Sequence, residues 1–424
     1  MIGDEIYQFA KELWPLNRSI TGNGLRETLQ KVSKHLSKFE IKSVPSDTKV
    51  FDWSVPKEWD VKEAYIITPS GMKICDFSEN NLHLVGYSIP FEGEISFEEL
   101  KTHLHTLPDQ PNAIPYVTSY YEERWGFCLS HEKFNTLERG IYKVVIKSRL
   151  FKGELNYGEL LIKGKSEKEI FLSTYICHPS MANNELSGSI VSLSLISYFK
   201  NFFLDKTIRF IFIPETIGSI AYIKNNFINL KKNTIGGYNL SCIGDERNHS
   251  CILSKYEDTV IDKSLIEAYK KLKIKFKKFS FLFRGSDERQ FNFPGVDLPV
   301  ATICRSKFLE YPEYHTSLDN FDLVTKKGVY GGFRVVKEAV KILQKKIIPK
   351  SLTICEPKLS KKGLHKDLSI KSQYSYKSKT KNLLSFLQYS DGSNDIDDIK
   401  NFLNIDKKEA LSLYSICKKN KLVE

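Results

Sequence analysis

The sequence predicts an α/β protein with a β-rich domain inserted near its start and a small helical module at its end. After about residue 140, near-continuous apolar runs alternate with helical stretches, which is typical of a sheet with helices on both faces. Residues 41–140 instead form short β-rich runs interrupted by Pro, Gly and Asn, and this predicts a separate β domain. Three short amphipathic stretches close the chain.

The opening segment predicts two helices, because apolar residues recur at helical spacing on both sides of the turn-rich LNRSITGNG. These helices have no sheet of their own, so we expect them to pack on the later sheet. Residues 1–40 and 141–345 then form one α/β domain, and residues 41–140 are an insertion into it. The strands of that domain are expected in EIFLSTYICH, TIRFIFIPE, TIGGYNLSCIG and LPVATICR.

The positive charge of the chain is concentrated in one stretch. Between Lys341 and Lys381 there are twelve lysines and two acidic residues, so +10 of the net charge of +12 falls there. Residues 346–381 have few large apolar side chains, which predicts a solvated linker. Residues 382–424 predict a winged-helix-like module, whose last helix has Asp406 and Glu409 at capping-box spacing.

Composition excludes several classes of protein. With 41% hydrophobic and 27% charged residues over 424 positions, the chain is neither disordered nor of low complexity. No apolar run reaches about 18 residues, and the first twenty residues lack the basic and apolar regions of a signal peptide. Eight cysteines without a CxxC pair, mostly flanked by apolar residues, indicate buried thiols. We therefore expect a cytoplasmic protein that does not enter a membrane.

Four segments place metal-competent side chains at or near the ends of apolar runs, where open α/β sheets bind their ligands. The residues concerned are His178, Glu215, Asp245 and His315. Histidine nitrogens and carboxylate oxygens can form a zinc site, and a further carboxylate can act as general base on water. Each signal alone is weak, since a single histidine after a strand is more often structural. Their ordered recurrence favours metal-assisted hydrolysis.

The order of these motifs resembles the co-catalytic zinc aminopeptidases, whose pattern runs His, N-D-x-x-S-G, E-E-x-G-S, Asp, S-D and a late His. The matching positions are His178, Asn183 to Gly188, Glu215 to Ser219, Asp245, Ser286 with Asp287, and His315. Strings such as PLNRSITGNG, STYICHPSMANNELSG, RGSDERQ and EYPEYHTSLDN resemble more closely the bacterial aminopeptidase-like proteins described as linked to polysaccharide biosynthesis. This resemblance implies a zinc-aminopeptidase-like α/β/α sandwich with an inserted β domain and a C-terminal winged helix.

Two departures from the aminopeptidase pattern affect the expected metal site. Asn184 stands where the pattern has the Asp that bridges two zinc ions, and Thr216 stands where it has a second Glu. Because these neutral side chains are weaker ligands, we expect one zinc ion rather than two. The resemblance assigns His178, Asp245 and His315 as its ligands and Glu215 as the general base. Glu185, one residue beyond the bridging position, would replace the missing ligand only if the loop shifts.

Other charged and aromatic residues are candidates for contacts with the substrate. These are Arg247, Arg284, Asp287 and Tyr314; internal ion pairing explains the charged residues equally well, and packing is the commoner role for such tyrosines. In the insertion, His103 and His105 are more consistent with a structural role than with metal binding. The aromatic residues Tyr116, Tyr120, Tyr121 and Trp125 either line a cleft over the active site or form the core of the insertion.

Three functional hypotheses follow. The first is a zinc-dependent hydrolase of an amide bond, in a peptide amino terminus or in an aminoacyl or N-acyl sugar. The second is a degenerate peptidase that binds a ligand and regulates through its winged helix. The third is a nucleic-acid binder that uses Lys407, Lys408, Lys418 and Lys419, although the acidic DGSNDIDDIK nearby opposes a phosphate backbone. Association of two copies of the chain stays open.

Overall fold

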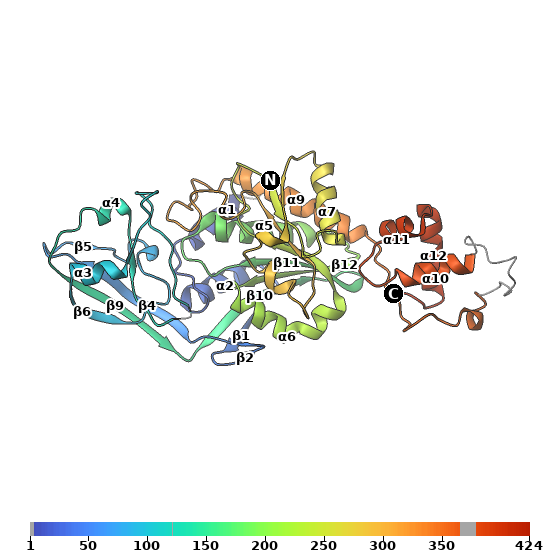
Figure 1. Ribbon diagram of the computed structural model, residues 1–424, viewed down its shortest axis with the longest axis horizontal. Helices are drawn as coiled ribbons and strands as arrows, with labels where there is room; N and C mark the ends of the chain where they lie inside the picture. The colour runs from blue at the N-terminus through green and yellow to red at the C-terminus, as the bar shows by residue number, and fades with distance from the viewer. Residues whose placement is uncertain (1–3, 121, 365–378) are drawn as a thin grey trace.

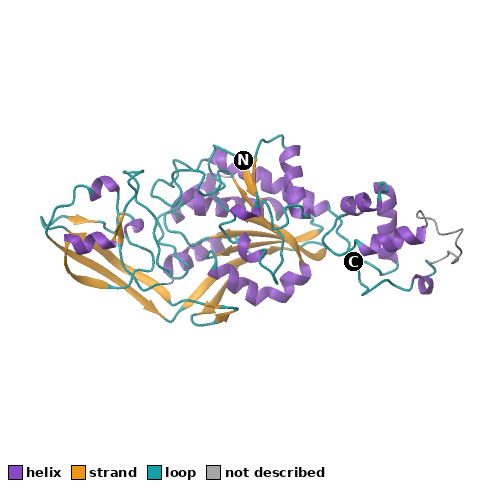
Figure 2. Cartoon of the chain, viewed as in Figure 1, coloured by secondary structure: helices purple, strands orange, loops and turns teal. Residues whose placement is uncertain are grey.

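The computed structural model describes residues 4–120, 122–364 and 379–424. Figure 1 shows three parts along the long axis of the molecule: the inserted domain at one end, the α/β domain in the middle, and a helical module at the other end. Strands dominate the first part, the middle part combines a sheet with helices, and the third part is helical (Figure 2). This arrangement leaves the α/β domain in contact with both of its neighbours.

The α/β domain is built on an eight-stranded sheet within the described residues. In spatial order its strands are β1 (Glu40–Pro45), β10 (Glu154–Ile162), β12 (Lys206–Ile213), β11 (Ser166–Tyr175), β13 (Thr234–Leu240), β16 (Val300–Cys304), β14 (Ser250–Ile252) and β15 (Lys277–Phe279). β11 runs parallel to β12 and β13, and β13 runs parallel to β16. The carboxyl ends of these four strands therefore meet at one edge of the sheet.

Helices cover both faces of this sheet. One face is covered by α1 (Asp4–Leu13), α2 (Asn23–His35), α5 (Ser187–Phe199), α7 (Val260–Lys271) and α9 (Lys326–Lys345), and the other by α6 (Ile217–Asn233) and α8 (Glu288–Phe291). Along β11, Ile170 and Leu172 pack into the first core while Phe171 packs into the second. Both faces of the strand are thus buried, which explains its continuous apolar sequence.

The inserted domain has its own antiparallel sheet, in the order β5 (Lys73–Ile74), β4 (Glu58–Ile67), β9 (Ile141–Phe151) and β6 (Phe91–Ser96). The short pair of β7 (Leu104–His105) with β8 (Phe127–Cys128) accompanies it, whereas the pair of β2 (Lys49–Val50) with β3 (Trp53–Ser54) lies against α6 (Figure 1). The short helices of the inserted domain are α3 (Phe97–Leu100) and α4 (His131–Phe134). The boundaries differ from those expected, because β1 joins the central sheet and β9 joins the insertion. The insertion therefore spans about residues 46–151 rather than 41–140.

The C-terminal module contains α10 (Lys379–Gln388), α11 (Ile396–Leu403) and α12 (Lys407–Lys419). Asp406 caps α12 by accepting the backbone N–H of Glu409, as the sequence predicts. The preceding stretch differs from the expected solvated linker, because Leu359 is buried in the core of this module and Ser351 pairs with Val423. Apolar side chains in an otherwise lysine-rich segment account for the difference. Residues 365–378 of that linker lie outside the described residues.

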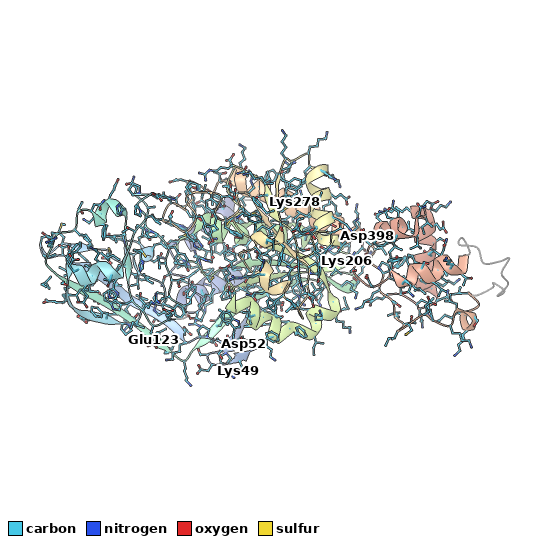
Figure 3. The ribbon with its side chains drawn as sticks, in the orientation of Figure 1. Lys49, Asp52, Glu123, Lys206, Lys278 and Asp398 are labelled. Atoms are coloured by element: carbon cyan, nitrogen blue, oxygen red, sulfur yellow. The ribbon has the colours of Figure 1, made fainter. Side chains whose placement is uncertain are left out.

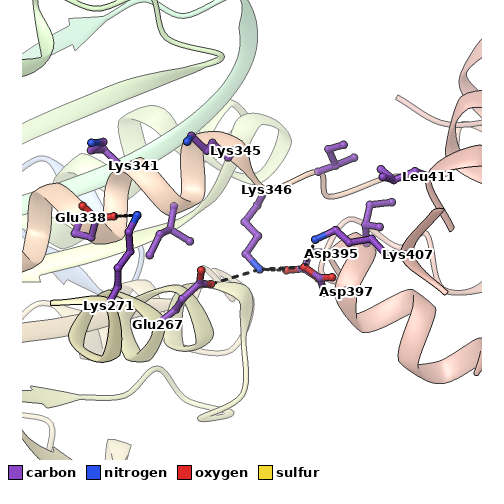
Figure 4. A pocket seen from close by; sticks show the side chains of 13 residues that line it. Glu267, Lys271, Glu338, Lys341, Lys345, Lys346, Asp395, Asp397, Lys407 and Leu411 are labelled. Atoms are coloured by element: carbon purple, nitrogen blue, oxygen red, sulfur yellow. Dashed lines mark hydrogen bonds and ion pairs between the residues drawn. The ribbon is translucent and has the colours of Figure 1, made fainter. Parts of the chain in front are cut away.

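Ion pairs join the C-terminal module to the α/β domain. Lys346, just after α9, lies 2.8 Å from Asp395, and Lys263 of α7 lies 2.6 Å from Asp398, which is labelled in Figure 3. A cavity of about 300 Å³ between the two parts is lined by residues of α7, α9, α11 and α12 (Figure 4). Lys407 of α12 faces this cavity and pairs with Asp397. The start of α12 is thus turned toward the α/β domain.

The sequence predicts that the chain has no membrane-spanning helix and that its cysteine thiols are buried. No helix of the described residues is both long enough and apolar enough to span a bilayer. All eight cysteines are free, and seven of them are buried. Cys355 departs from the expectation because it is exposed.

Candidate active site

The parallel strands deliver two of the candidate residues to one place. His178 follows the end of β11 by three residues, and Glu215 follows the end of the neighbouring β12 by two. The Nε2 atom of His178 lies 3.7 Å from an Oε2 atom of Glu215. Adjacent parallel strands with aligned ends explain this meeting of residues 37 positions apart in sequence.

The other nitrogen of His178 is held by a buried carboxylate. Its Nδ1 lies 2.8 Å from Oε2 of Glu185, whose side chain is fully buried 3.5 Å from the Nε atom of Arg18. Arg18 also donates from Nε to the backbone carbonyl of His178. Burial lowers the pKa of His178, but the hydrogen bond and charge of Glu185 and the charge of Glu215 raise it above its ordinary value. Glu185 thus orients the ring and directs Nε2 toward Glu215.

Glu215 lies in an environment that favours proton exchange. Burial raises the pKa of its carboxyl group, and the charges of His178 and Arg289 oppose this shift. Its backbone N–H donates to the Cys177 sulfur at 3.2 Å. The next residue, Thr216, has a φ of 63°, a left-handed conformation that is uncommon for a β-branched residue. This tight turn separates Glu215 from α6 and leaves its side chain partly accessible.

His315 completes the arrangement from a distant loop. Its ring centroid lies 5.4 Å from that of His178, and Tyr314 stacks on it at 3.9 Å. Burial, followed by the charge of His178, lowers the pKa of His315 to about 3, so the imidazole is neutral near pH 7. Its Nε2 is buried and has no hydrogen-bond partner among the described residues. A neutral, unpaired imidazole nitrogen in a buried site is a competent metal ligand.

Asp245, expected as the third ligand, takes part in a separate network. Its two oxygens accept hydrogen bonds from the backbone N–H groups of Arg247 and Ser306, the Ser306 hydroxyl and the Asn183 side chain. These four donors satisfy the carboxylate. The chain runs five residues beyond β13 before it reaches Asp245, and Cys242 on the way has a φ of 48°. In this structure the Asp245 carboxylate therefore holds its loop against Ser306 and Asn183, and its assignment as a metal ligand stays a prediction.

Neutral side chains occupy the place where the aminopeptidase pattern implies a second metal. Asn184 donates from Nδ2 to the Tyr175 hydroxyl at 2.7 Å, and that hydroxyl lies 2.5 Å from the Ser241 hydroxyl. Tyr175 and Ser241 stand at the carboxyl ends of β11 and β13. Burial raises the pKa of the Tyr175 hydroxyl well above its usual value, so this group is not a phenolate. Uncharged groups are weaker ligands for a second divalent ion than carboxylates, and the Asn184 Oδ1 atom is buried without a hydrogen-bond partner among the described residues.

Asp287 lies behind Glu215 instead of in a position to meet substrate. Its carboxylate is fully buried and accepts the Thr216 backbone N–H and the Ser219 hydroxyl, both at 2.8 Å. Burial, with the charge of Glu215, raises the pKa of Asp287 to about 8. Two buried carboxyl groups whose charges interact share a proton more readily than they both ionise. Asp287 therefore acts on Glu215 and on the turn that carries it.

Of the remaining candidates for substrate contact, the two arginines lie away from the histidine pair and Tyr314 lies beside it. Arg247 forms a two-pronged pair with Glu313 at 2.6 and 2.7 Å, and Arg284 lies 5.0 Å above the Phe281 ring. Both arginines thus have partners outside the histidine pair, as ion pairing and packing explain. Tyr314 is part of the centre through its stacking on His315.

Two further residues belong to the site: Tyr116, for which the sequence left a cleft over the active site and the core of the insertion as alternatives, and Asp319, which the sequence did not single out. Tyr116 of the insertion places its ring 5.3 Å from that of His178 and 5.1 Å from that of His315. Its backbone N–H donates to the His315 carbonyl at 2.8 Å. Asp319 accepts the backbone N–H groups of residues 182–184 and so fixes the turn before α5. Asp319 lies within the string HTSLDN, which also contains His315. The ring contacts of Tyr116 with both histidines favour the cleft over the active site for this residue.

Comparisons with known proteins agree with this fold. A family model described as a domain of unknown function, DUF4910, matches residues 7–346. The chain belongs to the DUF4910 family. A second model, described as a winged helix-turn-helix, matches residues 347–424. The boundary between the two models falls just after α9, where the DUF4910 domain meets the C-terminal module.

Relatives of this DUF4910 protein carry aminopeptidase-like names. A protein of Clostridium acetobutylicum, named provisionally for polysaccharide biosynthesis and for an aminopeptidase-like domain, is 40% identical over 398 residues, which cover 94% of this chain and 91% of that protein. A crystal structure of a provisionally named peptidase from the same organism is 37% identical, with a TM-score of 0.79, and covers 99% of this chain and 96% of that one. The resemblance inferred from the motifs is confirmed.

More distant solved structures show the fold of the DUF4910 domain. The zinc aminopeptidase BSAP of Bacillus subtilis is 14% identical with a TM-score of 0.58, over 79% of this chain and 92% of its own. At this identity the likeness concerns the fold alone. The predicted aminopeptidase-like α/β sandwich and the C-terminal winged helix are therefore both confirmed.

Proposed function

We propose that this DUF4910 protein is a hydrolase of amide bonds that uses one metal ion, zinc, held between His178 and His315. The observation that carries the proposal is the buried Nε2 of His315, which has no partner among the described residues and stands beside a second imidazole. A buried polar atom without a partner costs about 1–3 kcal/mol, so an absent ligand is the simplest reason for it. The peptidase-like names of the relatives support the same reaction class.

The proposed donor set is two imidazoles whose ring centroids lie 5.4 Å apart. Glu215 is the base in this proposal, and its Oε2 lies 3.7 Å from His178 Nε2, within reach of water bound beside that nitrogen. Glu185 on the Nδ1 side of His178 is the partner that orients a histidine ligand. A zinc ion bound there would polarise the amide carbonyl and lower the pKa of water.

The protein's own residues then divide the work. Glu215, whose pKa is raised by burial, takes a proton from the attacking water and returns it to the leaving amine. Glu185 and Arg18 hold His178 in one orientation. The Tyr116 ring covers both histidines and limits the access of water.

The proposed substrate is a peptide amino terminus or an amide-linked sugar. Both contain the bond that this centre would cleave, and the name of the Clostridium acetobutylicum relative connects that protein with polysaccharide biosynthesis. Carboxyl groups at Glu185, Glu215 and Asp287 surround the centre. They favour a neutral or cationic substrate over an anionic one.

A second candidate is a binding protein that has lost peptidase activity. The uncharged cluster of Tyr175, Asn184 and Ser241 favours it, because this cluster removes the ligands of a second metal. The two candidates differ in one measurable property, which is whether the folded chain binds zinc at His178 and His315.

The deciding experiment measures zinc per chain by elemental mass spectrometry, together with hydrolysis of aminoacyl anilides. Zinc in the wild type and its loss in His315→Ala, with no loss in a His131→Ala control, would support the hydrolase. His131 is a suitable control because it lies in the short helix α4 of the insertion. A wild type that takes up no added zinc would overturn the proposal and leave the binding protein.

A further inference from the structure

The largest cavity of those described in the structure lies in the inserted domain. Its volume is about 700 Å³, well within the range of small-molecule binding sites. Val85, Ile89 and Val117 form its apolar part, and Thr102, Ser119 and Glu123 are among its polar residues. Glu123 is labelled in Figure 3. No role in the reaction proposed above uses this cavity.

A short segment connects this cavity to the reaction centre. Tyr120 lines the cavity, and its hydroxyl lies 2.6 Å from that of Tyr116, whose ring contacts His178 and His315. Residues 116–120 thus have one end at the histidines and the other in the cavity wall. The hydrogen-bonded side chains of Tyr116 and Tyr120 thus contact the histidines on one side and the cavity on the other.

The segment is held firmly at both ends. Ser317 donates its backbone N–H to Ile114, just before the segment, at 2.8 Å. Within the segment, the Gly86 N–H donates to Val117 at 2.9 Å, and the Ser119 N–H donates back to Gly86 at 2.9 Å. The insertion is therefore fixed in register with the loop that carries His315. A ligand in the cavity would have a defined position relative to the reaction centre.

The lining indicates the chemical class of the ligand. Arg124 is paired with Glu122, and Glu123 adds a second acid, so the cavity has no surplus positive charge for a phosphate. The pKa of His105 is lowered, first by burial and then by His103, and a neutral imidazole both donates and accepts. Hydroxyl groups of Thr102 and Ser119 and the Tyr120 ring complete a wall suited to an uncharged, hydroxylated ligand.

We infer that the inserted domain binds a sugar unit of the substrate, so that the amide bond attached to this sugar reaches His178 and His315 past Tyr116. This inference rests on the proposed function for the identity of the reaction centre. It selects the amide-linked sugar over the free peptide. It also assigns the inserted domain a function, sugar binding, that the cleavage of peptides alone would not require.

Blocking the cavity tests the inference. Thr102 and Thr136 are a matched pair: both are exposed in the insertion, and both hydroxyls donate to the carbonyl three residues earlier, at 2.8 and 2.7 Å. Only Thr102 lines the cavity. Thr102→Trp would place a bulky ring in the cavity and narrow it, whereas Thr136→Trp adds the same side chain elsewhere.

The measurement is saturation-transfer NMR on the full-length protein with N-acetylglucosamine, and with glycylglycine as the rival ligand. We expect binding of N-acetylglucosamine to the wild type and to Thr136→Trp, and at least a tenfold loss of affinity in Thr102→Trp. The inference would be overturned if the wild type did not bind N-acetylglucosamine, or if Thr102→Trp bound it with the same affinity. It would also be overturned if the wild type bound glycylglycine and Thr102→Trp lost that binding instead.

Zinc content, measured on the same samples, separates this inference from the proposed function. Thr102→Trp leaves His178 and His315 untouched, so its zinc content should equal that of the wild type. Zinc uptake without sugar binding would refute the sugar site and leave the hydrolase proposal standing. Sugar binding without zinc uptake would refute the hydrolase proposal and leave the sugar site standing.

Discussion

His178 and Glu215 face each other across 3.7 Å at the ends of two adjacent parallel strands. Because Nδ1 of the same imidazole contacts Glu185 at 2.8 Å, the ring stands between two carboxylates. Glu185 fixes the proton on Nδ1, and the lone pair of Nε2 then points toward Glu215. This relationship assigns different roles to the two glutamates, and the roles can be separated by mutation.

His178→Ala should abolish metal binding. It removes one of two imidazoles at the centre, and we expect zinc content to fall more than tenfold, in line with the loss of a ligand. Elemental mass spectrometry of the purified variant checks this, with circular dichroism to show that the fold persists. Unchanged zinc in His178→Ala would place the metal elsewhere in the chain.

Glu215→Gln should keep the metal and lose the reaction. The amide cannot take a proton, so turnover should fall by about 10²–10⁴, while zinc content stays at the wild-type level. Glu246→Gln is a control, because Glu246 pairs with Lys327 at the surface. If zinc and turnover disappear together in Glu215→Gln, this residue is a ligand and the assignment as base is wrong.

Glu185→Gln should weaken metal binding and destabilise the fold at the same time. We expect a 10–100-fold loss of zinc affinity, because the orienting partner of His178 is weakened. Arg18, which is fully buried beside Glu185, would lose its charge partner, at a cost of about 3–5 kcal/mol in the free energy of unfolding. Zinc titration and urea unfolding measure the two effects.

A double variant distinguishes these two effects of Glu185. Arg18→Met combined with Glu185→Gln removes both buried charges, so part of the lost stability should return. Zinc affinity should stay low, because His178 still lacks its carboxylate partner. Recovery of zinc affinity in the double variant would show that Glu185 acts only through stability.

The sequence is enough to predict the fold because its signals are local. Apolar runs such as those of β11 and β12 show strands buried on both faces, and the C-terminal helices have visible capping residues. His178 and Glu215 follow directly from this, since they stand two or three residues after adjacent strands. A residue close to a strand end has little freedom to move away from the edge of the sheet.

The sequence predicts the partners of a side chain less well where the chain travels further from its strand. Asp245 comes five residues after β13, and a turn at Cys242 carries it into a network with Ser306 and Asn183. Ser241, the first residue past the strand, occupies the place at the sheet edge. Tyr116 could not be assigned for a different reason, because its position depends on how the insertion docks on the His315 loop.

Lys206 predicts a pH dependence of stability that is independent of the active site. Burial lowers its pKa to about 8, against an ordinary value of 10.5. Its amine donates to the carbonyls of Gln344 and Lys346 at 3.0 and 2.7 Å, where α9 ends. Because the folded pKa is depressed, the unfolded chain binds more protons between about pH 8 and 10.5, so this residue adds stability as pH rises through that window.

The size and sign of this contribution can be measured with Lys206→Met. A shift of this size corresponds to about 3 kcal/mol. The free energy of unfolding of the wild type, minus that of Lys206→Met, should therefore increase by up to this amount between pH 7 and 10. Comparing the two proteins cancels the titration of the buried tyrosines and thiols that both share. Urea unfolding at several pH values provides the data. A difference that stays constant with pH, or that shrinks as pH rises, would mean that Lys206 is protonated throughout and solvated at the end of α9.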